Sequence, residues 1–200
     1  MMQHSIERAG LYRFFAAIFR YPSPEEWRTI VEGLASARAA HAVLGVATTD
    51  FDELARAIRA TTREEIEPAY VRTFVNGLPS IVAAPYESSY APAERRLEVL
   101  AAVDAFYERC GVRVSGDGEG HGPDMPDHIA TELELMQYLA AEEHDSAQFA
   151  AVVASIAAEF LETHLAPFVR ALTDEVRDGL HHHALRALAT YLDAELRRLS

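Results

Sequence analysis

Apolar residues recur along this chain at the three- and four-residue spacing of amphipathic helices. Between Ile6 and Arg20 they cover one broad helical face, and Tyr21-Pro22 predicts the end of that helix. The next residues, Ser23-Pro24-Glu25-Glu26, match a capping box, with Ser at N-cap, Pro at N1 and Glu at N3. They predict the start of a second helix. Asp50 and Glu53 predict a similar start for a third.

The rest of the chain continues in helical segments. Pro68 suggests the first turn of a short helix that ends at Val75, and Pro92 opens a long helix through Cys110, with Leu97 among its inward residues. A further helix is predicted over residues 149–165, kinked or restarted by Pro167. The last one runs from about Leu180 to Leu199.

Two stretches lack helical periodicity. Residues 78–91 read as a long central loop, and residues 115–124 contain the alternating glycines of a hinge. No stretch alternates apolar and polar residues as a strand would. We therefore predict an all-α fold, a single-domain helical bundle over residues 1–200 with a hinge at 115–124. Such a hinge would permit a monomer to exchange into a domain-swapped dimer.

The stretch from Gly122 to Met136 holds the most informative polar residues. Asp124 is placed as N-cap of a helix, with Asp127 in its first turn. An apolar arc follows on a helical wheel, and His128 and Glu132, four residues apart, lie at its edge, where they can pair. Such a pair is either a satisfied core-edge pair or a recognition site for cationic or hydrogen-bonding groups. The residues alone leave both readings open.

Composition narrows the class of protein. Hydrophobic residues make up 50% of the chain and charged residues 24%, as in a soluble globular protein. No apolar run approaches the ~20 residues of a membrane span and no signal-peptide pattern opens the chain, so we expect a cytoplasmic protein without membrane insertion. The net charge of −13 opposes binding to nucleic acid and favours cationic partners. The single cysteine, Cys110, excludes an internal disulfide and a CxxC pair.

Few residues suggest catalysis. The glycine segment lacks the spacing of a phosphate-binding loop, and no Ser or Cys lies beside a recognisable base. His121, Asp124, Asp127 and His128 form a cluster that would suit a small metal-dependent hydrolase, which is the alternative function, although no ligand spacing fixes its geometry. The triplet His181–His183 lies inside a helical pattern, where adjacent residues face different directions. We expect no catalytic residues, no cofactor and no bound metal.

A resemblance favours the recognition reading. The segment from Pro126 to Met136, PDHIATELELM, resembles the PDHxxxELxFM signature of the TorD/DmsD/NarJ family, with Leu135 where the family often has Phe. Residues 8–22, 70–74 and 85–90 are similar to other family segments. Residues 160–168 resemble a later family stretch, with Phe168 in place of the usual Trp.

The resemblance implies a cytoplasmic chaperone that is not an enzyme. Its partner would be the catalytic subunit of a molybdopterin-containing oxidoreductase, whose N-terminal leader and apo form it would hold during cofactor insertion, before export or assembly. Twin-arginine leaders combine two arginines with an apolar stretch, to which an acidic helical protein is complementary. The implied groove lies between the signature helix and the 78–91 loop. The peptide-binding residues implied are Tyr70, Phe74, Pro85, Tyr86, Glu87, Ser88, Asp127, His128 and Glu132.

Overall fold

The computed structural model describes residues 4–76, 81–114, 125–146 and 148–199. Within these ranges the chain is helical throughout, apart from turns and one isolated β-bridge, which confirms the all-α prediction. The α-helices are α1 (Ser5–Phe19), α2 (Pro24–Val43), α3 (Thr49–Ala60), α4 (Arg63–Tyr70), α5 (Arg96–Arg109), α6 (Ile129–Asp145), α7 (Ala150–Phe160), α8 (Ala166–Glu175) and α9 (Gly179–Leu199). Shorter turns are the π-helical η1 (Val71–Val75) and η4 (Leu161–Leu165) and the 3₁₀ turns η2 (Glu87–Tyr90) and η3 (Ala93–Arg95). The predicted hinge at 115–124 lies outside the described residues.

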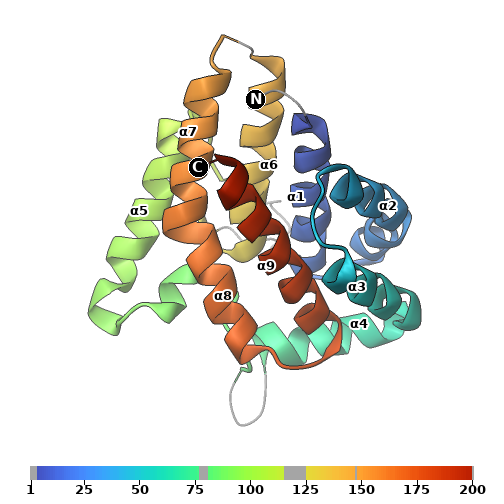
Figure 1. Ribbon diagram of the computed structural model, residues 1–200. Coiled ribbons are helices and arrows are strands. Elements are labelled where there is room, and N and C mark those ends of the chain that lie inside the picture. The colour runs from blue at the N-terminus through green and yellow to red at the C-terminus, as the bar shows by residue number, and fades with distance from the viewer. Residues whose placement is uncertain (1–3, 77–80, 115–124, 147, 200) are drawn as a thin grey trace.

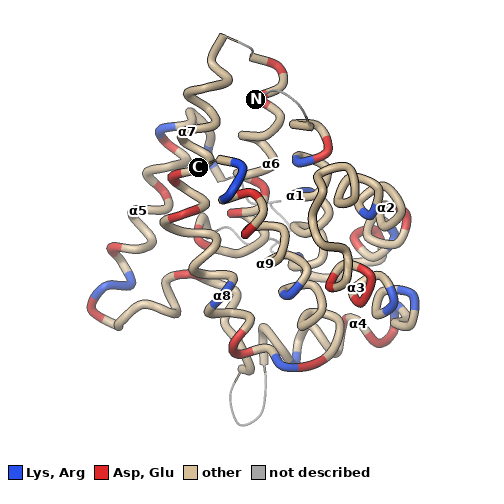
Figure 2. The backbone as a smooth tube through the Cα atoms, in the orientation of Figure 1, with Lys and Arg blue, Asp and Glu red and all other residues tan. Residues whose placement is uncertain are grey.

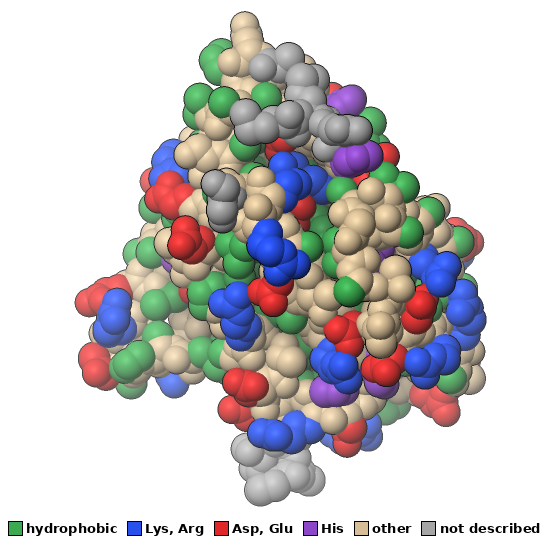
Figure 3. Space-filling model, in the orientation of Figure 1, with side chains coloured by type: hydrophobic (Ala, Val, Ile, Leu, Met, Phe, Trp, Pro, Cys, Tyr) green, Lys and Arg blue, Asp and Glu red, His purple; other side chains and the backbone are tan. Residues whose placement is uncertain are grey.

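Helix α1 lies at the centre of the bundle (Figure 1). It packs against α6 and α2, while α9 packs against α3 and α8. Helix α5 lies on the outer side, and its main contacts are with η2 and η3 at the end of the central loop. Basic and acidic positions of both signs are scattered along the chain and over the face shown in Figure 3, so the net negative charge is not gathered there (Figure 2).

The structure confirms one predicted helix start and corrects another. The Ser23 start is confirmed, because its Oγ accepts a hydrogen bond from the Glu26 amide at 3.1 Å. The Asp50 start is wrong, since α3 begins at Thr49 and Asp50 lies in its first turn. The Asp50 carboxylate instead accepts hydrogen bonds from Arg186 and Thr190, each at 2.6 Å, and so ties α3 to α9.

The helix predicted to begin at Pro68 begins five residues earlier. Thr62 and Glu65 form a capping box that satisfies the free amides upstream, so Pro68 falls inside α4. A π-helical turn, η1, follows directly and ends at Val75, the predicted last residue. The helical segment therefore begins earlier than predicted but ends at the predicted residue.

Helix α5 is shorter than predicted. Residues 93–95 form a 3₁₀ turn, and the α-helix starts at Arg96. Leu97, predicted to point inward, is 79% exposed, because the first turns of α5 project beyond the bundle. Gly111 adopts a φ of 70° directly after the helix, as a C-terminal glycine cap does.

The run from α7 to α8 is almost continuous. The structure shows a π turn over Leu161–Leu165 and a new α-helical segment from Ala166, as the restart at Pro167 predicted. The 26-residue stretch Ala150–Glu175 is long and apolar enough to cross a membrane by length and composition, with a mean hydropathy of 1.3 over its most apolar window. Half of its most apolar window is buried inside the bundle, and the core helix of a soluble protein passes the same test.

One arginine lies entirely inside the bundle. Arg8 of α1 donates from Nε to Glu195 of α9 and from Nη1 to Glu143 of α6, both at 2.6 Å. Burial lowers the pKa of Arg8, but its neighbours, chiefly Glu195, outweigh it, and the net pKa is raised. Three helices therefore meet at one buried cation.

We predict that Arg8→Met destabilises the fold by about 3–5 kcal/mol, because it leaves the buried Glu143 and Glu195 with only the partly exposed Arg198 as a neighbouring cation. The matched control is Arg170→Met, which removes an exposed pair with Asp193 and should cost only about 0.5 kcal/mol. Urea denaturation of both variants measures the difference. Equal losses would contradict a structural role for the buried cation.

Candidate functional site

A short extended segment lies against the start of α6. We call residues 83–91 the strap. Tyr86 and His128 form an antiparallel bridge, in which the Ile129 amide donates to the Pro85 carbonyl and the Glu87 amide donates to the Asp127 carbonyl, each at 2.9 Å. The Ser88 amide adds a bond to Asp127 Oδ2 at 3.1 Å. The loop and the signature segment are therefore joined through their backbones.

This pairing sets where α6 begins. The helix starts at Ile129, and His128 is its N-cap, with Nδ1 accepting a hydrogen bond from the Ala130 amide at 3.1 Å. The prediction that Asp127 lies in the first helical turn is wrong, because its carbonyl and carboxylate are both committed to the strap. Asp124, the predicted N-cap, lies outside the described residues. Burial, and then the positive charge of Arg20, lower the pKa of His128 to about 4, so the ring is neutral at physiological pH.

Aromatic rings pack on one side of the bridge. The Tyr86 ring meets His128 edge-on at a centroid distance of 5.2 Å. Tyr70 and Phe74 lie in an adjoining cluster, in which the ring of His181 is 4.9 Å from that of Phe74. Sequence reasoning assigned no role to His181, which fills a core position. The Ala83 amide donates to the Thr73 carbonyl at 3.0 Å and so joins the strap to η1.

Carboxyl groups gather on the other side. Glu87 of the strap lies 3.0 Å from Nδ1 of His164 in η4. Glu132 is fully buried, and its carboxyl neighbours are Glu87 and Asp127. The predicted pairing of His128 with Glu132 does not form, because His128 Nδ1 bonds the Ala130 amide. Sequence reasoning missed His164, although it lies inside the 160–168 stretch that resembled the family.

Two further contacts fix the end of the strap and the segment before α6. The Tyr90 ring packs on Phe168, the residue at the family's Trp position, with centroids 5.6 Å apart. Tyr107 of α5 donates to the Pro126 carbonyl at 3.2 Å. The strap therefore contacts η1, the start of α6, η4 and α8.

The structure brings the nine predicted peptide-binding residues into one region. Tyr70 and Phe74 lie in the aromatic cluster beside the bridge, and the other seven lie at or next to the bridge itself. Six are buried: Tyr70, Phe74, Pro85, Asp127, His128 and Glu132. Tyr86, Glu87 and Ser88 are only partly buried. Of the nine side chains, those three are the ones that reach the surface of the bundle.

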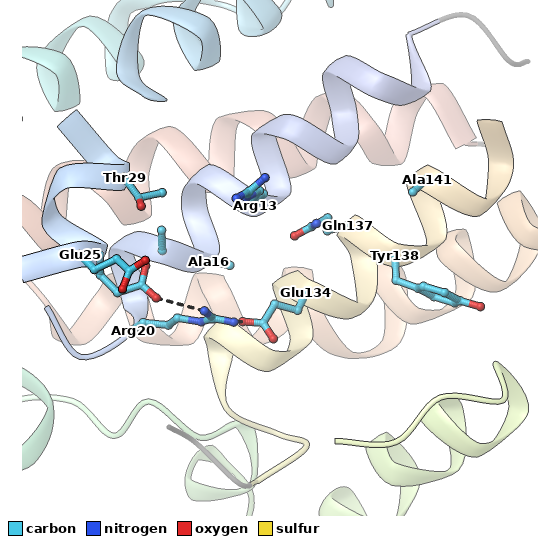
Figure 4. A pocket seen from close by; sticks show the side chains of 11 residues that line it. Arg13, Ala16, Arg20, Glu25, Thr29, Glu134, Gln137, Tyr138 and Ala141 are labelled. Carbon is cyan, nitrogen blue, oxygen red and sulfur yellow. Dashed lines mark hydrogen bonds and ion pairs between the residues drawn. The ribbon is translucent and has the colours of Figure 1, made fainter. Parts of the chain in front are cut away.

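A groove of about 570 Å³ lies nearby, between α1, α2 and α6. Arg20 spans it, paired with Glu134 on one side and with Glu26 at 3.1 Å on the other (Figure 4). Its floor includes Ala16 and Ala17, and Tyr138 lies on its wall. This groove is distinct from the predicted one between the signature helix and the 78–91 loop, where the strap packs directly on α6.

The alternative metal cluster finds no support. His121 and Asp124 lie outside the described residues. Among the residues that the structure does describe, no three or more His, Cys, Asp or Glu side chains are grouped so that they could hold a metal ion. Asp127 is hydrogen-bonded to the strap and His128 caps α6, so each already has a structural partner.

The fold is that of a known class of small helical proteins. It matches the solved structure of a protein described as a redox enzyme maturation protein from Archaeoglobus fulgidus, with a TM-score of 0.55 and 19% identity over 92% of this chain and 93% of that one. Residues 44–174 match the family model of the nitrate reductase delta subunit, and the chain belongs to this family. The resemblance seen in the signature segment is thereby confirmed.

Two relatives are similar over most of their length. The chain is 27% identical over 165 residues to the chlorate reductase assembly chaperone protein of Ideonella dechloratans. It is equally similar to the selenate reductase assembly chaperone protein of Thauera selenatis. Each match covers 80% of this chain and 72% of the relative.

We predict that acid weakens the fold through His128. Its folded pKa of about 4 lies below its ordinary value of 6.5, so the unfolded chain takes up the proton first, and stability is lost as pH falls from 6.5 towards 4. Between pH 7.5 and pH 5 the loss from this residue is about 2 kcal/mol. His128→Asn keeps an N-cap acceptor and should remove that loss, whereas His144→Asn, at an exposed site on the same helix, should not. Denaturant titrations at both pH values test this, and an unchanged loss in His128→Asn would contradict it.

Proposed function

We propose that this protein is a cytoplasmic assembly chaperone for a molybdopterin-containing oxidoreductase, with no turnover of its own. It binds the N-terminal leader and the apo form of the catalytic subunit during cofactor insertion, before export or assembly. The observation that carries the proposal is the strap paired with the signature helix, in a chain of the nitrate reductase delta subunit family. The names of the two relatives, assembly chaperones for chlorate and selenate reductase, support it.

The partly buried side chains of the strap give the proposal its chemistry. Tyr86 offers a ring face and Ser88 a hydroxyl, and the Glu87 carboxylate beside them, 14% exposed and paired with His164, adds negative charge, so the surface suits a peptide that combines a cation with apolar residues. A leader with two arginines and an apolar stretch fits this description. The net charge of −13 adds long-range attraction for such a segment.

The contacts of the buried polar residues at the start of α6 are the reason why the proposal includes no catalytic activity. Asp127, His128 and Glu132 are buried, and the first two spend their polar atoms on the backbone of the strap and of α6. A general base must reach the proton that it removes. Buried groups held by the fold are suited to positioning a binding surface.

We predict that Tyr86→Ala weakens binding of the client's N-terminal leader about tenfold, because it removes a partly buried aromatic contact. The control is Tyr138→Ala, which removes a tyrosine from the separate α1–α2–α6 groove and should leave the affinity unchanged. Calorimetry with a synthetic leader of the molybdoenzyme subunit encoded nearest to this chain's gene measures both. A loss confined to Tyr138→Ala would place the leader in that groove and overturn the proposed surface.

The chaperone role has its own test. Co-expression of the same catalytic subunit with the chain should raise the molybdenum content of the purified subunit, measured by elemental analysis, and Tyr86→Ala should raise it less. An equal molybdenum content with and without the chain would contradict the role, whatever the peptide affinity.

A further inference from the structure

Glu132 is buried among groups of its own charge. It is 0% exposed in the first turn of α6, and no donor in the described part of the chain makes a hydrogen bond to either of its carboxyl oxygens. Asp127 shares the same interior, with Oδ2 bonded to the Ser88 amide and Oδ1 without a partner among the described residues. Glu87 reaches in from the strap, and both of its oxygens lie within 3.1 Å of His164 Nδ1.

These three carboxyl groups cannot all be ionised at low cost. An unpaired carboxylate in a protein interior costs several kcal/mol, and neighbouring like charges add to that. The carboxyl groups of Glu132 and Glu87 are close enough for a hydrogen bond, but a bond between two acceptors requires a proton on one of them. Burial first, and then the charges of Glu87 and Asp127, raise the pKa of Glu132 well above its ordinary value.

We infer that Glu132 is a positioning residue that carries a proton, shares it with Glu87, and by this hydrogen bond reinforces the backbone bonds between the strap and the start of α6. The proton replaces a cation that the described interior does not supply at this position. With it, Glu87 is held from two sides, by His164 of η4 and by Glu132 of α6. Loss of the proton leaves the carboxylates of Glu132 and Glu87 facing each other, and their repulsion pushes the strap away from α6.

The strap therefore opens as pH rises. When the strap is open, Glu132 meets water and titrates near its ordinary pKa; when it is closed, the residue keeps its proton. A group whose pKa is raised by an arrangement stabilises that arrangement at low pH, and the stabilisation is lost as pH rises towards the raised pKa. Between the two pKa values the opening equilibrium rises tenfold for each pH unit.

Other titratable groups face this interior from each packed element. Tyr107 of α5 remains neutral, because burial and then Glu132 raise its pKa far above 10. Tyr86 of the strap has its pKa raised by burial and then by Asp127. His128 is neutral above about pH 4, and Arg20 beyond it remains a cation. His164 is another side chain that contacts Glu87, so it needs its own variant.

Hydrogen exchange of the strap amides tests the inference without any partner, so the result does not depend on the proposed function. The amides of Glu87, Ser88 and Ile129 form the bonds between strap and α6, and Leu188 in the core of α9 gives a reference. Protection factors, corrected for the intrinsic rate, should fall for the strap amides as pH rises above 6, by up to about tenfold for each pH unit. They should stay constant for Leu188.

Two variants test whether Glu132 or His164 causes the pH dependence of strap protection. Glu132→Gln has the shape of the protonated acid and can donate to Glu87, so its strap protection should be independent of pH. His164→Gln should keep the wild-type slope. A flat wild-type profile would overturn the inference, and so would a slope that survives Glu132→Gln and disappears in His164→Gln.

An infrared measurement on the unmodified chain covers the case in which Glu132→Gln fails to fold. The carbonyl stretch of a protonated carboxylic acid should be present at pH 7, where exposed acids are ionised, and should disappear when the strap opens at higher pH. Its absence at pH 7 would overturn the inference.

Discussion

The candidate site depends on a backbone interaction between two segments that are irregular by themselves. A loop that packs against a helical bundle must find partners for its own amides and carbonyls, because buried backbone groups without hydrogen bonds are costly. Here the strap finds them at Asp127 and Ile129, immediately before and at the first residue of α6. The same bonds delay the start of the helix until Ile129, which makes His128 the N-cap and turns Asp127 towards the strap.

The rest of the bundle keeps the start of α6 in place. Helix α1 lies antiparallel to α6 and is paired with it near both ends, through Arg8 with Glu143 and through Arg20 with Glu134. The strap is also held by two π-helical turns, since Thr73 of η1 and His164 of η4 are its partners. Turns of this kind occur often at functional sites, because they re-aim backbone and side-chain groups that a regular helix would direct elsewhere. Both therefore act as fixed supports for the strap, whose only regular elements are the bridge at Tyr86 and the 3₁₀ turn η2.

Much of the fold could be predicted, because helix periodicity and capping are local. The apolar face of α1, the Ser23 start of α2 and the glycine cap after α5 all follow from neighbouring residues. What could not be predicted are contacts between distant segments. The local pattern predicts a cap at Asp50, but its partners Arg186 and Thr190 lie on α9, more than a hundred residues away, where no local pattern can reveal them. The helical pattern predicts that Leu97 points inward, but it cannot reveal that the first turns of α5 project beyond the neighbouring helices.

At the candidate site, too, contacts between distant segments could not be predicted from local patterns. The family signature brought Asp127, His128 and the strap residues to attention together, and the structure does place them together. Their partners were hidden, because the pairing of His164 with Glu87 spans 77 residues of sequence. Spacing alone predicted that Glu132 would pair with His128 on the next turn, whereas the fold surrounds Glu132 with carboxyl groups from other segments. The sequence signal that pointed to an unusual environment was the position of Glu132 at the edge of an apolar helical arc.

Site-specific photocrosslinking tests the central claim most directly. A photoreactive phenylalanine analogue at position 86, on the strap, or at position 138, in the separate groove, would be activated in a mixture with the apo catalytic subunit, and mass spectrometry would identify the joined peptides. The account predicts crosslinks from position 86 to the N-terminal segment of the subunit and few from position 138. Crosslinks to that segment from position 138 alone would show that the strap does not form the binding surface.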